Sequence, residues 1–207
     1  MFDYEKSIND CMELITPASI LSSDTSLLDS ITAFETVSGP FFLILQGNQF
    51  IGWLSYKDLH KQPLRLCLFS MLINLERMLL EVALKNSKES FKKMPENRLK
   101  KAQELYKLKK FNFTQSGDYY TSNLMECTNM IDKFTIAQNT QSVVEMVPVL
   151  KNDHLCRKAE MLRNEIAHPG MEEQSSNLPN RESLWPFIQW AETLEDQLQN
   201  YLEYVRG

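Results

Sequence analysis

The chain has 207 residues, 43% of them hydrophobic, which is enough to bury an ordinary core as one large domain or two small ones. Its net charge of −5 argues against a uniformly basic nucleic-acid binder. No apolar stretch approaches the roughly 18 residues of a membrane span, and the start MFDYEKSIND is too acidic and polar for a secretory signal. We therefore expect a cytoplasmic protein with no membrane segment.

The first sixty residues predict a small α/β unit. A short apolar run at Ile20 and Leu21 precedes a helix that Asp24, Thr25 or Ser26 would cap, and Ser38-Gly39-Pro40 ends it. Two strand-like runs, FFLIL and FIGWLS, follow and are joined by the turn residues Gly47-Asn48. Another helix is predicted from Lys57. The expected order is strand, helix, strand, strand, helix.

Residues 61–207 predict a second, all-helical domain. The expected elements are a long helix beginning at LRLCLFSMLINLERMLLEVALK, a helix from about Pro95, a loop at FNFTQSGD, and helices over about 118–134, 153–167 and 183–205. Residues 143–149 are apolar but contain Pro148, so they predict a short helix end or an irregular segment. The fold class is therefore mainly α, with a small α/β unit at residues 1–60.

Three polar or small residues in GWLSYKD predict a nucleotide site at the end of the second hairpin strand. Gly52 permits close backbone approach, Ser55 offers a hydroxyl at a helix start, and Asp58 can accept hydrogen bonds from a ribose diol. In the alternative interpretation, Gly52 relieves crowding in the strand and Ser55 only caps the helix.

The segment from about Ile15 to His60 resembles a single CBS motif, with its ITPASI entry, its hairpin and its Gly-x2-Ser-x2-Asp ending. The resemblance implies that Ser55 lies near a phosphate and Asp58 on a ribose of an adenine nucleotide, which would act as a regulatory ligand. Such motifs also serve as dimer contacts without a ligand. Because a lone unit leaves a sheet face or edge uncovered, we expect two chains to pair as a homodimer.

Positive charge is concentrated between Lys85 and Lys110. This segment contains ten Lys or Arg residues and three Glu residues, which gives a local charge of +7. The rest of the chain therefore carries −12. Such a segment can hold the backbone of a polyanion, although a charge run is often only a solvated helix face. We predict RNA contacts at four of its lysines: Lys92, Lys93, Lys100 and Lys101.

The stretch LRNEIAHPG predicts a site for phosphate-ester chemistry. Arg163 is a permanent cation, Asn164 an amide, and His168 titrates near neutral pH. Residues five apart on a helix lie about 140° apart around its axis, but Pro169 and Gly170 should end the helix and free the imidazole from helical register. Alternatively, His168 only caps its helix, and Arg163 makes a surface ion pair with Glu160 or Glu165.

The sequence RNEIAH resembles the HEPN signature, an Arg followed after four to six residues by His, with a polar residue directly after the Arg. The helices from about Pro63 to Val205 resemble that superfamily in number and order. The resemblance implies a homodimeric, metal-independent endoribonuclease that leaves a 2′,3′-cyclic phosphate. It assigns Arg163 to the phosphate, Asn164 to orientation and His168 to proton transfer, with no cofactor required for catalysis.

Two further expectations complete the prediction. The scattered cysteines lack CxxC spacing, and His60, His154 and His168 are the only histidines, so we expect neither a disulfide framework nor a metal site. The alternative to an enzyme is a non-catalytic module that binds RNA or protein, or regulates a toxin–antitoxin or defence system.

Overall fold

The structure is a computed structural model that describes residues 15–37, 39, 41–86, 91–116, 124–167 and 181–207. It divides the chain into two units, the first ending at Leu64 and the second comprising Arg65–Gly207. The predicted boundary lay between residues 60 and 61. Most described residues are helical and three short strands form the only sheet among them, so the predicted fold class is confirmed.

The first unit has the predicted element order, with short 3-10 turns added. Its elements are η2 (Pro17–Ser19), β1 (Ile20–Ser22), α1 (Leu27–Thr36), β2 (Phe41–Gln46), β3 (Gln49–Ser55) and η3 (Tyr56–His60). Ser26 caps α1, because its hydroxyl accepts a hydrogen bond from the Asp29 backbone N–H. The helix predicted from Lys57 is wrong at its start: a 3-10 turn comes first, and α2 (Gln62–Lys85) begins after it.

The sheet of the first unit has the order β1-β2-β3, parallel between β1 and β2 and antiparallel between β2 and β3. Gly47 adopts a φ of +60° in the hairpin turn, a conformation that costs glycine little. On one face, Phe42 packs edge-to-face against Phe34 of α1, with 4.7 Å between ring centroids. Side chains alternate along a strand, so Phe41 lies on the opposite face, where it and its neighbour Trp53 are exposed.

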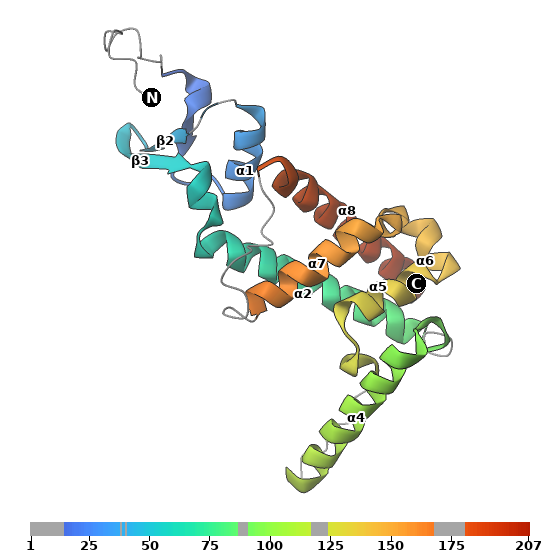
Figure 1. The fold of residues 1–207 in the computed structure, drawn as a ribbon. Coiled ribbons are helices and arrows are strands. Elements are labelled where there is room, and N and C mark those ends of the chain that lie inside the picture. Colours follow the sequence, from blue (N-terminus) through green and yellow to red (C-terminus); the bar gives the residue numbers. More distant parts are fainter. Residues whose placement is uncertain (1–14, 38, 40, 87–90, 117–123, 168–180) are drawn as a thin grey trace, which may run out of the picture. The chain divides into compact units, whose positions relative to one another are not determined.

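The second unit contains α2, which begins just before the unit boundary, and a set of further helices. They are η4 (Phe91–Lys93), α4 (Glu96–Ser116), η5 (Leu124–Cys127), α5 (Met130–Gln138), α6 (Gln141–Met146), η6 (Pro148–Lys151), α7 (Asp153–Ala167) and α8 (Arg181–Arg206). Hydrogen bonds from Asn74 to Glu195 and from Arg206 to Glu81 join α2 to α8, which lie side by side (Figure 1). The α4 helix extends away from these helices (Figure 1).

Two predicted elements of this unit are wrong. The loop predicted at FNFTQSGD is helical as far as Ser116, because the first strong helix breaker in that stretch is Gly117. Instead of one helix over 118–134, the chain forms η5 and then α5; residues 117–123 lie outside the described part. A cap separates the two, since the Asn129 backbone N–H donates to the Asp132 carboxylate three residues on.

The other helices of this unit agree more closely with the sequence pattern. The predicted helix over 153–167 is α7, and it buries Ala159 and Leu162 of its apolar stripe, whereas Leu155 and Ile166 are only half-buried. The near-heptad of α8 is buried from Leu184 to Tyr201, but Val205 is 42% exposed. The short α6 and η6 occupy the segment around Pro148.

Candidate functional site

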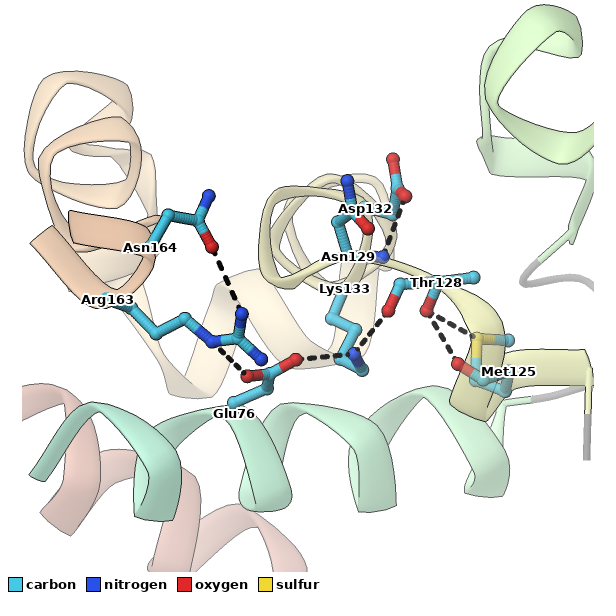
Figure 2. A network of polar contacts seen from close by, with 8 residues as sticks. All are labelled: Glu76, Met125, Thr128, Asn129, Asp132, Lys133, Arg163 and Asn164. Carbon is cyan, nitrogen blue, oxygen red and sulfur yellow. Dashed lines mark hydrogen bonds and ion pairs between the residues drawn. The ribbon is translucent and has the colours of Figure 1, made fainter. Parts of the chain in front are cut away.

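The α7 helix places Arg163 near its C-terminal end, facing α2. Its Nε donates a hydrogen bond to Glu76 Oε2 at 3.1 Å, and its Nη1 donates to Asn164 Oδ1, also at 3.1 Å (Figure 2). The alternative pairing with Glu160 or Glu165 is therefore wrong: the partner lies 87 positions away in the sequence. Because a guanidinium has five N–H donors, three of them remain without a partner among the described residues.

A second cation, Lys133 of α5, holds the same carboxylate from the other side. Its Nζ lies 2.9 Å from Glu76 Oε1 and 2.7 Å from the backbone carbonyl of Thr128, to which it also donates (Figure 2). The Lys133 side chain is only 4% exposed, Glu76 16% and Arg163 30%. Glu76 thus bridges a buried cation and a partly exposed one, and buried charges require such pairing.

A depression of about 400 Å³, here called the Arg163 pocket, adjoins this network. Six residues from three places in the chain line it: Glu76, Thr128, Asn129, Met130, Arg163 and Asn164. Its charged groups are one carboxylate and one guanidinium, and its uncharged polar groups are two carboxamides and a hydroxyl. A pocket of this volume can accommodate one nucleotide, with anionic groups recognised at Arg163.

Three further charged groups lie at the start of α5, beside the pocket. Arg98 of α4 pairs with the buried Asp132 at 2.7 Å. Burial raises the pKa of Glu160 above its ordinary value of 4.5, while a hydrogen bond from the Ile131 backbone N–H acts in the opposite direction. Both carboxylates lie where the helix dipole favours negative charge, so the first turn of α5 is already occupied by acidic side chains.

Of the predicted catalytic residues, the structure brings Arg163 and Asn164 together, whereas His168 lies outside the described residues. The last described residue of α7 is Ala167, directly before the histidine. The arginine and the amide are therefore fixed in space at the helix end from which the histidine follows.

The predicted nucleotide residues are engaged with one another. The Ser55 backbone N–H and its hydroxyl both donate to Asp58 Oδ2, at 2.8 Å and 2.6 Å, and Lys61 Nζ lies 2.5 Å from Asp58 Oδ1. The bond to Lys61, followed by those to Ser55, holds the pKa of Asp58 well below its usual range. A Cβ on Gly52 would meet open space, so crowding in the strand does not explain this glycine. The capping interpretation of Ser55 matches this geometry.

The four predicted RNA-binding lysines have different surroundings. Lys93 donates to the Thr140 hydroxyl at 3.0 Å, and Lys100 pairs with Glu96 one turn earlier on α4. Lys101 is exposed beside Arg98, and Lys92 is exposed on η4. Lys100 and Lys101 therefore lie on one stretch of α4, whereas Lys93 is bound to Thr140, the N-cap residue of α6.

Sequence reasoning missed Glu76 and Lys133, the two residues that fix Arg163. A signal was present, because each is a charged residue within an apolar run: LINLERMLL around Glu76, and MIDKFTIA around Lys133. In helices that bury an apolar face, a charge at a buried position requires a partner of opposite charge. The pattern could not identify which distant residue that partner would be.

In the part of the chain that the structure describes, no three His, Cys, Asp or Glu side chains are grouped as metal ligands would be. Burial raises the pKa of the Cys156 thiol to about 12, with a smaller contribution from Asp153. A search of the described helices for a long apolar segment finds none that could cross a membrane.

The fold and site together define a mainly helical protein with an Arg-Asn pair at a pocket in its helical unit. Comparison of the chain with models of protein families, with curated proteins and with solved structures finds no match. The HEPN and CBS resemblances therefore depend on the motifs in the sequence itself.

Proposed function

We propose that this protein is a metal-independent endoribonuclease of the HEPN type that acts as a homodimer. The observation that carries the proposal is the fixed Arg163 guanidinium, which lines a pocket of about 400 Å³ with Asn164 beside it. Three N–H donors of the guanidinium have no partner among the described residues, and a bidentate contact to a phosphate needs two of them.

In this proposal Arg163 binds the scissile phosphate and stabilises the negative charge that develops on its oxygens. Asn164 orients the guanidinium through the hydrogen bond between Nη1 and Oδ1. The proton of the ribose 2′-hydroxyl passes to His168, the attacking oxygen forms a 2′,3′-cyclic phosphate, and the leaving 5′-oxygen takes up a proton. Such general acid–base help is worth about 100-fold to 10,000-fold in rate.

The test is cleavage of an unstructured RNA in EDTA by the wild type, Arg163→Ala and His168→Ala. We expect cleavage by the wild type alone, with cyclic-phosphate ends. Arg157→Ala is the matched control, because Arg157 lies on the same helix in an exposed ion pair with Asp153. This variant should cleave RNA as the wild type does. Equal cleavage by all four proteins, or none by any, ends the catalytic proposal.

Support for dimerisation comes from the open sheet face of the first unit. Phe41 is 48% exposed and Trp53 70%, and α1 packs on the opposite face through Phe34. Aromatic residues at such exposure are typical of surfaces that associate. Sedimentation of the wild type and Trp53→Lys tests this: a dimer should be lost in the variant, and a monomeric wild type contradicts the proposal.

RNA contact along α4 is proposed from its charge and exposure. Each phosphate contact to single-stranded RNA contributes about 0.7 to the slope of log affinity against log salt. Lys100→Ala with Lys101→Ala should therefore lower that slope by about 1.4, whereas replacing the exposed Lys151 of η6 by Ala should leave it unchanged. An unchanged slope in the double variant removes these lysines from the interface.

A regulatory adenine nucleotide at the first unit is the remaining part of the proposal. The motif resemblance supports it, but the capping pair of Ser55 and Asp58 would have to open for these residues to bind a nucleotide. Titration of the cleavage rate with ATP, ADP, AMP and cyclic nucleotides tests it, and no change at saturation removes it.

The competing function is a non-catalytic module that binds RNA or a protein partner, with a regulatory role in a toxin–antitoxin or defence system. The ion pair between Arg163 and Glu76 favours it, because a paired arginine also serves a purely structural role. RNA binding without cleavage in the assay above would support this function.

A further inference from the structure

The carboxylate of Glu76 pairs with two cations, Lys133 and Arg163. Lys133 and Glu76 alone would form a neutral pair, with the lysine 4% exposed and its second hydrogen bond made to the Thr128 carbonyl. Arg163 adds a second cation to the same carboxylate, at its other oxygen. Each Glu76 oxygen therefore serves a different cation.

The geometry at Arg163 separates two groups of donors. Nε and one Nη1 proton are held by acceptors of the protein, Glu76 and Asn164 (Figure 2). Nη2 makes no bond to the residues drawn there. Holding the guanidinium at Nε and Nη1 while leaving Nη2 available is what orienting an arginine toward an anion requires, because a loose arginine must lose rotamer freedom on binding.

The other end of the network reaches the pocket wall. Thr128, whose carbonyl accepts from Lys133, lines the Arg163 pocket and directly precedes the cap residue Asn129. The chain of contacts thus runs from the wall contributed by Thr128, through Lys133 and Glu76, to the guanidinium on the facing wall. Its side chains come from α2, α5 and α7, and the Thr128 carbonyl comes from the residue pair between η5 and α5, so the network links these three helices.

We propose that Glu76 is a positioning residue for Arg163, held in place by Lys133, and that it sets the orientation in which the guanidinium meets a phosphate group. The inference rests on the ribonuclease function proposed above. Although Glu76 also lines the pocket, in this proposal it acts through Arg163 and not on the reacting atoms. Its removal lowers kcat more than it raises KM, because a misplaced group about 1 Å from its productive position can cost up to about 100-fold in rate.

The experiment compares Glu76→Gln, Glu76→Asp and the control Glu81→Gln, which removes the carboxylate partner of another arginine, Arg206, from the same helix. We expect kcat for RNA cleavage to fall about 10-fold to 100-fold in Glu76→Gln, to recover in part in Glu76→Asp, and to stay unchanged in Glu81→Gln. Unchanged kcat in Glu76→Gln, or an equal loss in Glu81→Gln, overturns the proposal.

A second readout does not depend on cleavage. In the ¹⁵N NMR spectrum the Arg163 Nε–H signal, assigned by its loss in Arg163→Lys, reports the bond to Glu76 directly. A charge-assisted hydrogen bond is worth about 1.5–3 kcal/mol, so its proton should exchange with water about tenfold faster or more in Glu76→Gln. If the wild type cleaves no RNA, the ribonuclease proposal fails, and this exchange rate alone decides whether Glu76 holds Arg163.

If Glu76→Gln fails to fold, the cause is Lys133, because this buried cation loses its partner in the variant. The double variant Glu76→Gln with Lys133→Met removes that charge while keeping Arg163. Both readouts are then taken on the double variant. Slow Nε–H exchange in it, as in the wild type, overturns the proposal.

Discussion

In each of the two sites predicted from the sequence, a carboxylate accepts hydrogen bonds from a residue that is expected to bind a ligand. The carboxylate and that residue are close in the sequence in one site and far apart in the other. In the first unit Asp58 accepts two hydrogen bonds from Ser55, three positions before it. In the second, Glu76 accepts from Arg163, 87 positions after it. The first is a local helix cap, whereas the second joins two helices and a buried lysine.

The difference shows in what remains available to a ligand. Both donors of Ser55, its N–H and its hydroxyl, are directed to Asp58, whose other oxygen contacts Lys61. Arg163 keeps three of its five donors and lies at a pocket of about 400 Å³. A local pair can satisfy all the donors of its members. Arg163, held at Nε and Nη1, still offers Nη2 to a ligand, so the second unit is the better candidate for the functional site.

The largest difference between the two carboxylates should appear in stability. Glu76→Gln leaves the Lys133 cation without its partner in a site where it is 4% exposed, and breaking such a pair costs about 3–5 kcal/mol. Urea unfolding at pH 7 measures this loss. Lys133→Met in the same chain should restore most of it, and a loss below about 1 kcal/mol in Glu76→Gln would show that the cluster is solvated after all.

The local cap should contribute less. Asp58→Asn or Ser55→Ala should cost about 1 kcal/mol, the usual value of a helix cap. The pKa of Asp58 is lowered in the folded protein, so the charged form stabilises the fold. This contribution is present above the ordinary value of 3.8 and is lost as the pH falls below it.

Unfolding of the wild type and Asp58→Asn between pH 7 and pH 3 measures both effects. The gap in unfolding free energy should be widest at pH 7 and shrink at the acid end. A gap that stays constant with pH would show that the carboxylate charge plays no part in the cap.

Local patterns predicted most of the fold, because they act within a few residues. The cap candidates Asp24, Thr25 and Ser26 before an apolar period marked the start of α1, and Gly47-Asn48 marked the hairpin. The errors arose where weak signals compete: Asn112 and Thr114 disfavour a helix without breaking it, so α4 continues to Ser116.

The candidate site was predictable only in part. The motif RNEIAH indicated Arg163 and Asn164, which the structure finds hydrogen-bonded to each other. Glu76 and Lys133 stayed hidden, because their partners lie 87 and 57 positions away and helical periodicity carries no information across that distance. An ion pair between helices becomes visible only when their packing is known.

The smallest expected effect concerns Glu160, a carboxylate intermediate between the two cases. It accepts a hydrogen bond from the Ile131 backbone, yet burial raises its pKa, so its charged form is disfavoured by folding. The stability that its protonated form contributes is present below pH 4.5 and is lost as the pH rises through the raised folded pKa. Glu160→Gln, which stays neutral, should therefore be more stable than the wild type at pH 7.

The gain should remain below about 1 kcal/mol, because solvent screens a half-buried carboxylate. Urea unfolding of both proteins from pH 7 to pH 4.5 measures it, and the difference should shrink toward the acid end. The sign of this trend is opposite to that of Asp58→Asn, which loses stability at pH 7. If Glu160→Gln is instead destabilised at pH 7, the hydrogen bond from Ile131 and the nearby Arg98 outweigh burial, and the Glu160 carboxylate stabilises the first turn of α5.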